Sequence, residues 1–188
     1  MFKKITGLLF VSIISFNAQA TGVDLRLADK TAEFVYLTES STFGYGGADV
    51  GIGFFYNEAD DFMFSATVMV SGHSAGNNRP LQFGAGAKLL YASLDVPDES
   101  VSALALGGQI RYLIPAGVPV ALLAEAYFAP EIVTFSNADG VTEYRFAVEL
   151  EVTPSARAYV GFRHIEMDLG AGDYELDDDA HIGVRIEF

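Results

Sequence analysis

From Thr21 onward, apolar and polar residues alternate with a period of two along most of the chain. This is the pattern of β-strands that have one apolar face and one polar face. The clearest example is YRFAVELEV, residues 144–152, in which apolar residues at the even positions alternate with Arg145, Glu149 and Glu151. No stretch of twelve residues shows a helical period with capping residues. The pattern therefore predicts an all-β domain.

Ten segments carry this alternation and are predicted to be strands: 23–28, 31–38, 48–57, 62–71, 83–92, 104–114, 120–128, 144–152, 157–169 and 181–188. Most of them approach the roughly 9 to 11 residues that a tilted strand needs to cross a bilayer. The first two are short, which leaves a count of eight strands as an alternative. Segment 157–169 is ambiguous, because facing Arg163 inward also turns Ile165 and Met167 inward.

The polar faces carry charged residues at mid-strand positions: Arg26, Asp49, Lys88, Arg111, Glu125, Arg145, Glu149, Arg185 and Glu187. On a soluble sandwich or a lipocalin-like barrel these charges would face water, whereas in a membrane barrel they would line the lumen. Aromatic residues near the strand ends favour the membrane barrel, whose two interfaces carry aromatic girdles: Tyr56, Phe62, Phe83, Tyr91, Tyr112, Phe128, Tyr144 and Phe188. We therefore predict a transmembrane, antiparallel, up-and-down β-barrel of about ten strands.

The first twenty residues have the features of a secretory signal peptide. Lys3 and Lys4 precede an apolar run over 5–16, and Ala18-Gln19-Ala20 has the small-x-small arrangement of a cleavage site. The run is shorter than the ~20 residues of a spanning helix, although an uncleaved anchor is the alternative. We expect export by the general secretion pathway, removal of residues 1–20 and a barrel domain over 21–188. The chain contains no Cys, so disulfides play no part.

The chain ends on HIGVRIEF, an alternating segment with an aromatic last residue. The spacing of His181, Gly183, Ile186 and Phe188 resembles the C-terminal signal that the assembly machinery of bacterial outer-membrane barrels reads. That resemblance implies the outer membrane of a diderm bacterium, with outer-membrane lipid and lipopolysaccharide as surroundings. It also implies that the last strand pairs with residues 23–28, because an open edge in hydrocarbon leaves backbone groups unpaired.

Placing Phe188 in the periplasm fixes on which side each connection lies. The acidic connections 57–61, 95–100, 136–140 and 170–180 fall outside, and the acid-free connections 72–80, 115–119 and 153–156 fall inside. This sorting supports the predicted register.

Four stretches together resemble the YfaZ family of outer-membrane proteins: FGAGAKLLYA, the EAYFAPE run at 125–131, TEYRFAVELEVTPSARAYVGFRHIE and LDDDAHIGVRIEF. The likeness extends over most of the mature chain but includes no catalytic motif. It implies an outer-membrane barrel and supplies no substrate and no functional residues.

Charge and candidate chemistry narrow the functional classes. Removing Lys3 and Lys4 leaves nine of the 11 basic residues against 25 acidic ones, a net charge of −16, which disfavours nucleic acid as a partner. No cofactor motif is present. The acidic loop at 170–180 offers Asp173, Asp177 and Asp179 as weak Ca²⁺ ligands, but it lacks the calcium-loop spacing, and a solvated charge run is the simpler interpretation.

Three functions stay open at this point. The nine inward charges favour a plugged, non-enzymatic barrel with a structural or surface role in the envelope, because a lumen this narrow is filled by paired side chains. The alternative is a narrow channel for small solutes or ions. A less favoured alternative is an outer-leaflet hydrolase built on His164 and Glu166, for which the sequence places no serine. His73, beside Ser71 and Ser74, lies in an expected periplasmic turn.

Overall fold

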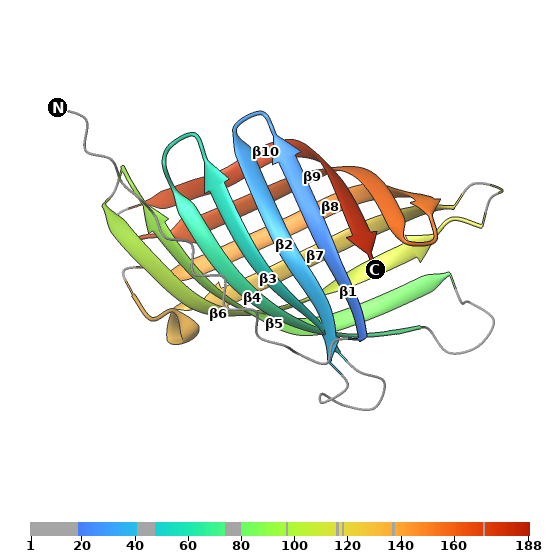
Figure 1. The fold of residues 1–188 in the computed structure, drawn as a ribbon. Coiled ribbons are helices and arrows are strands. Elements are labelled where there is room, and N and C mark those ends of the chain that lie inside the picture. Colours follow the sequence, from blue (N-terminus) through green and yellow to red (C-terminus); the bar gives the residue numbers. More distant parts are fainter. Residues whose placement is uncertain are drawn as a thin grey trace.

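A computed structural model describes residues 19–40, 48–73, 80–96, 98–115, 117, 119–136, 138–170 and 172–188. In this part ten antiparallel strands form one closed barrel (Figure 1), in the order β1-β10-β9-β8-β7-β6-β5-β4-β3-β2. The predicted fold class and strand number are confirmed, and the alternative of eight strands is wrong. The expected signal peptide, apart from Gln19 and Ala20, and most of the connection at 72–80, including Ser74, lie outside the described residues.

The strands are β1 (Gln19–Ala28), β2 (Thr31–Ser40), β3 (Ala48–Asn57), β4 (Phe62–His73), β5 (Leu81–Leu94), β6 (Glu99–Leu113), β7 (Val120–Pro130), β8 (Gly140–Thr153), β9 (Ala156–Asp168) and β10 (Asp173–Glu187). A short 3-10 helix, η1 (Glu131–Val133), follows β7. No helix in the described ranges is long and apolar enough to cross a membrane.

The last strand closes the barrel on the first. β10 pairs with β1 from Gly22 opposite Glu187 to Ala28 opposite His181. We call the end of the barrel at which β1 starts and β10 stops the open end. The opposite end, with the turns at 29–30, 58–61, 95–98, 131–139 and 169–172, is the closed end.

The expectation of a long acidic loop over 170–180 is wrong, because β10 already begins at Asp173. Residues 173–186 pair with β9, and a register shift between Glu175 and Asp177 interrupts the ladder. The shift turns both Leu176 and Asp177 into the barrel, where they are 3% and 5% exposed. The run of acids hid this strand from the sequence pattern, because a bulge breaks the alternation.

Side chains alternate between the inside and the outside of the barrel along every strand, as the pleat of a strand requires. Large apolar side chains point outward on all ten strands, for example Ile52 at 57% exposed, Leu106 at 63% and Ile182 at 63%. The ambiguous strand β9 turns Arg163, Ile165 and Met167 inward, each at most 2% exposed. Its inward face is therefore part charged and part apolar.

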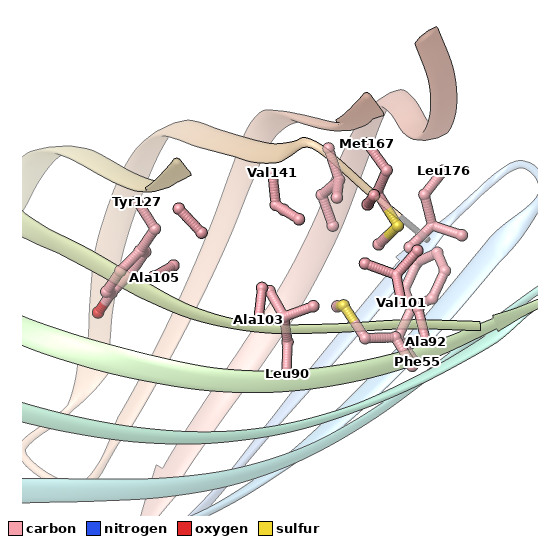
Figure 2. Close-up of a cluster of buried hydrophobic side chains, with 14 of the residues drawn as sticks. Phe55, Leu90, Ala92, Val101, Ala103, Ala105, Tyr127, Val141, Met167 and Leu176 are labelled. Atoms are coloured by element: carbon pink, nitrogen blue, oxygen red, sulfur yellow. The ribbon is translucent and has the colours of Figure 1, made fainter. Parts of the chain in front are cut away.

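The core of the molecule lies inside the barrel, toward the closed end (Figure 2). It is a cluster of buried side chains that we call the apolar plug: Phe55, Met63, Met69, Leu90, Ala92, Leu94, Val101, Ala103, Ala105, Tyr127, Ala129, Ala138, Val141, Ile165, Met167 and Leu176. Val133, Leu169 and Tyr174 pack against it from the turns and from β10. Most of the plug residues come from the strand halves next to the closed end, so this half of the lumen is filled.

Candidate functional site

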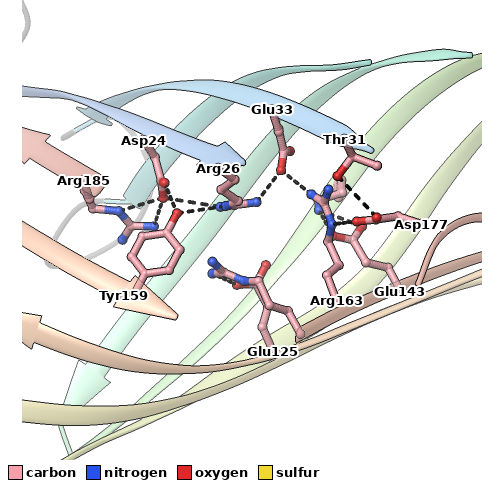
Figure 3. Close-up of polar contacts among 12 residues, drawn as sticks. Asp24, Arg26, Thr31, Glu33, Glu125, Glu143, Tyr159, Arg163, Asp177 and Arg185 are labelled. Carbon is pink, nitrogen blue, oxygen red and sulfur yellow. Dashed lines mark hydrogen bonds and ion pairs between the residues drawn. The ribbon is translucent and has the colours of Figure 1, made fainter. Parts of the chain in front are cut away.

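The middle of the lumen holds a network of buried charges (Figure 3). The inward positions of the strands supply both signs. One connected set of bonds and two separate pairs, Lys88–Glu143 and Arg145–Glu125, make up this network, whose members are Asp24, Arg26, Glu33, Lys88, Glu125, Glu143, Arg145, Tyr159, Arg163, Asp177 and Arg185. Charged groups are rarely buried unless they are paired, and here each has a partner of opposite charge or a phenolic hydroxyl.

Asp24 is fully buried and accepts the largest number of these bonds. Arg185, its cross-strand neighbour on β10, donates from Nε at 3.0 Å and from Nη2 at 2.6 Å. Arg26 donates at 3.4 Å, and the hydroxyl of Tyr159 also donates to Asp24. These bonds connect β1 to β9 and β10 next to the seam where the barrel closes.

Arg163 is the second centre of the network and lies where the charges meet the apolar plug. It donates from Nε to Asp177 at 2.6 Å and from Nη1 to Glu33, which also accepts from Arg26 at 2.7 Å. The guanidinium stacks over the ring of Phe55 at 5.0 Å. Because Glu33 is on β2 and Arg163 is on β9, this pair links strands that are not neighbours in the sheet.

Further pairs also bridge non-adjacent strands. Lys88 on β5 donates to both carboxylate oxygens of Glu143 on β8 at 2.8 Å. Arg111 on β6 donates to Glu149 on β8 at 2.6 Å. Charged pairs that cross a lumen hold its walls at a fixed separation, since each carboxylate and each cation is buried and cannot separate without losing its partner.

The half of the lumen next to the open end contains a cavity of about 320 Å³, which we call the vestibule. Tyr127, Lys88 and Arg145 line it on the side of the plug, and Glu39, Asp49, Arg157 and Glu187 line it near the open end. Uncharged polar side chains such as Thr67, Gln82 and Gln109 form much of the remaining wall. The lumen is thus filled at one end and hollow at the other.

A family model described as YfaZ precursor matches residues 3–188, nearly the whole chain. The chain belongs to the YfaZ family. The resemblance found in the sequence is thereby confirmed. No match was found among the curated proteins.

In this YfaZ-family barrel most of the nine predicted lumen charges are paired: Arg26, Lys88, Arg111, Glu125, Arg145, Glu149 and Arg185. Glu187 pairs with Arg157 at the rim of the open end, at 3.0 Å. Asp49 lines the vestibule but forms no ion pair within the described ranges. The structure therefore does not join Asp49 to the network.

Six members of the network are not among the nine predicted lumen charges: Asp24, Glu33, Glu143, Tyr159, Arg163 and Asp177. Asp24 lies two positions before Arg26 in β1 and therefore on the same inward face. The alternation of apolar and polar residues in this strand already indicated that Asp24 points into the lumen. Arg163 was left open because its face is partly apolar. Asp177 was assigned to a loop, and no pattern revealed it, since its inward orientation depends on the bulge in β10.

The four residues of the terminal pattern divide between the two faces of β10. Ile186 and Phe188 point outward and are 44% and 75% exposed, while His181 points into the lumen and is 4% exposed. Gly183 also faces inward, where a Cβ atom would overlap the ring of Tyr159. The tyrosine that bonds Asp24 thus requires a glycine at this place in the pattern.

The structure does not bring the three candidate calcium ligands together. Asp177 is bonded to Arg163 inside the barrel, whereas Asp173 begins the strand at the closed end, so these carboxylates do not converge with Asp179. In the described part no group of three metal-ligating residues is found.

His164 points outward near the closed end, where its Nδ1 lies 2.7 Å from Asp178 and its ring stacks on Tyr144 at 4.8 Å. Its Nε2 lies 3.6 Å from Glu166, and no hydrogen bond joins it to a serine within the described residues. His73 contacts Gln82 at 3.0 Å at the opposite end of the barrel.

Proposed function

We propose that this YfaZ-family chain is an outer-membrane barrel whose lumen is closed, and that it serves a structural or surface role in the bacterial envelope without catalysis. The observation that carries the proposal is the apolar plug. Phe55, Ala92, Val101, Ile165 and Met167 are each 0% exposed, so the closed half of the lumen has no space for a hydrated ion or solute.

A membrane location is supported by the outer surface. Apolar side chains with 37–63% exposure cover the outside of the strands, among them Leu27, Phe54, Leu89 and Val160. Soluble monomers rarely expose apolar patches larger than a few hundred Å², whereas lipid tails cover such a belt in a membrane barrel. The word precursor in the family description fits an exported protein.

Aromatic side chains mark both edges of this belt, in keeping with interfacial girdles. Tyr56, Tyr91 and Phe128 point outward near the closed end, and Phe83 and Tyr112 do so near the open end. With the open end in the periplasm, the turns with Asp60, Asp95 and Asp98 face outward among lipopolysaccharide. Assembly then follows from the terminal pattern on β10, which the assembly machinery would read before the strand closes on β1.

Hydrogen bonds connect neighbouring turns at the closed end. Asp61, 0% exposed, accepts hydrogen bonds from Asn57 at 2.9 Å, Tyr174 at 2.7 Å and the backbone of Asp95 at 2.8 Å. Lys30 pairs with Glu58 at 3.3 Å on the surface, and that hydrogen bond raises the pKa of Lys30. This compact end supports a rigid envelope component, since binding loops are usually longer and more mobile.

Conductance across planar bilayers tests the closed lumen. The mature protein, refolded and migrating as a folded species on unheated gels, is expected to give no conductance steps over a range of voltages. A water-filled porin in the same lipid serves as the positive control. Discrete steps would overturn the closed barrel and favour the second candidate, a narrow channel, for which the polar vestibule is the supporting observation.

Cell fractionation tests the location independently. We expect the protein in the outer-membrane fraction, and recovery from the soluble periplasm would contradict the membrane barrel. Unchanged lipopolysaccharide species after overexpression are expected for a non-enzymatic protein. New deacylated species that disappear with His164→Ala would favour the hydrolase instead.

A further inference from the structure

Two polar groups at the inner limit of the vestibule have no hydrogen-bond partner among the residues that the structure describes. Tyr127 is 2% exposed and its hydroxyl is unpaired, and Arg145 is 4% exposed with an unpaired Nε. Figure 2 shows the tyrosine ring at the edge of the plug with its hydroxyl turned away from the apolar side chains. A buried polar atom without a partner carries a desolvation cost that no hydrogen bond offsets. Both residues line the cavity, so a bound acceptor there would remove that cost.

The mouth of the vestibule, at the open end of the barrel, carries an excess of carboxylates instead of an excess of hydrogen-bond donors. Glu39 on β2 lies directly across from Asp49 on β3, and both line the cavity. Neither carboxylate forms an ion pair with any described residue. Like charges in directly opposite cross-strand positions destabilise a sheet, so a cationic group seated between the two carboxylates would be favourable.

The other charges of the vestibule compensate one another. Arg111 pairs with Glu149, Arg145 with Glu125, Arg157 with Glu187 and Arg185 with Asp24. Among the described residues, this leaves a surplus of hydrogen-bond donors beside the plug and a surplus of carboxylates at the mouth. A purely anionic ligand would be repelled at the mouth, and a purely cationic ligand would leave the inner donors unpaired.

We infer that the vestibule binds a small zwitterionic solute with a carboxylate at one end and an ammonium at the other, such as a dipeptide. The carboxylate accepts from Tyr127 and Arg145, and the ammonium lies toward Glu39 and Asp49. The volume of about 320 Å³ is in the range of small-molecule pockets. The site goes beyond the closed-barrel function, since it takes up a solute from the periplasmic side and does not pass it across the membrane.

Three matched probes separate the two ends of this site. Glycylglycine has both charges, N-acetylglycylglycine has only the carboxylate, and glycylglycinamide has only the ammonium. Each is titrated into the isotope-labelled mature protein in detergent micelles, and amide chemical shifts are followed by NMR. We expect glycylglycine to shift amides near Tyr127 and Glu39 with saturation, and each singly charged probe to bind about fivefold or more weakly.

Two substitutions then assign the ends. Tyr127→Phe removes an unpaired hydroxyl and keeps the ring, so the barrel stays folded; it should weaken glycylglycine about fivefold and leave glycylglycinamide unchanged. Glu39→Gln should weaken the binding of glycylglycine and glycylglycinamide, and it should not weaken N-acetylglycylglycine, whose carboxylate is repelled less once Glu39 has lost its charge. Tyr174→Phe, at the closed end, is the control and should change none of the three.

The proposed site is overturned if no probe gives saturable shifts, if all three bind equally, or if Tyr127→Phe binds glycylglycine as the parent does. None of these outcomes bears on conductance, so the closed barrel and the vestibule site can fail separately.

Discussion

The two halves of the lumen are built by the same ten strands and are filled in opposite ways. Toward the closed end the inward side chains are apolar and packed, with Phe55, Ile165 and Met167 all 0% exposed. Toward the open end most inward side chains are charged or polar, with a few apolar ones such as Leu37 and Leu123, and they surround the vestibule. Outward side chains are apolar along both halves, so only the inward positions distinguish the plug from the vestibule.

This contrast shows how the position of a plug can be predicted from the sequence pattern of a membrane barrel. Where a strand alternates between apolar and polar, its inward face meets water or paired charges. Where both faces are apolar, as in residues 103–106 of β6, whose inward members Ala103 and Ala105 are at most 1% exposed, the inside must be packed. Local failure of the period of two therefore marks a closed lumen in a chain whose outside faces lipid.

The largest expected effect is at Arg163, where the two halves meet. Arg163→Ala leaves Glu33 with one cation in place of two and Asp177 with no basic partner inside the barrel. Removing one member of a buried ion-pair network destabilises a fold by about 3–5 kcal/mol. We expect the free energy of unfolding, measured with urea on the refolded protein in lipid vesicles, to fall by this amount.

Arg157→Ala is the matched control, since Arg157 pairs with Glu187 at the rim, where the side chains are 26% and 42% exposed. Exposed pairs contribute about 0–1 kcal/mol. Equal losses for the two variants would show that the buried network is no more important to the barrel than its rim.

Most of the fold could be predicted because lipid imposes simple rules on the outside of a barrel. Apolar outward positions at period two fixed the face of each strand, and the terminal pattern fixed that β10 pairs with β1. The ends of the strands could be predicted less accurately from the sequence pattern. Charges such as Asp173 and Asp177 belong equally well to a loop and to a strand above the hydrocarbon region, and the pattern does not separate these cases.

The partners inside the lumen could not be predicted. The sequence shows that Lys88 and Glu143 point inward, but their pairing across the lumen at 2.8 Å depends on the stagger of strands that are three apart in the barrel. The position of Glu39 opposite Asp49 likewise depends on the register across a connection at 41–47. Pairs between distant strands follow from the closed geometry, which a linear pattern does not contain.

A smaller effect, about 2–5 kcal/mol, is expected within the plug from Leu90→Ala. Leu90 is 2% exposed among plug residues, so its truncation removes apolar contacts and leaves a cavity. Leu37→Ala tests the other half, because Leu37 lines the vestibule and is only partly buried. In the same urea titration, we expect Leu37→Ala to lower the free energy of unfolding by less than half as much as Leu90→Ala does. A larger cost at Leu37 would contradict the division of the lumen into a packed half and a hollow half.

The smallest effects come from removing single hydroxyls, one from each half. Tyr174→Phe removes the hydrogen bond of 2.7 Å to Asp61 at the closed end and is expected to cost about 0.5–1.5 kcal/mol. Tyr127→Phe removes a buried hydroxyl that has no partner, so its cost should be near zero, or stability should rise slightly because the phenylalanine no longer buries an unpaired polar atom. Both free energies are measured in lipid vesicles without added solute, where the vestibule site is empty of a zwitterion. A clear loss for Tyr127→Phe under these conditions would mean that its hydroxyl is already bonded within the barrel, and the donor surplus beside the plug would be removed.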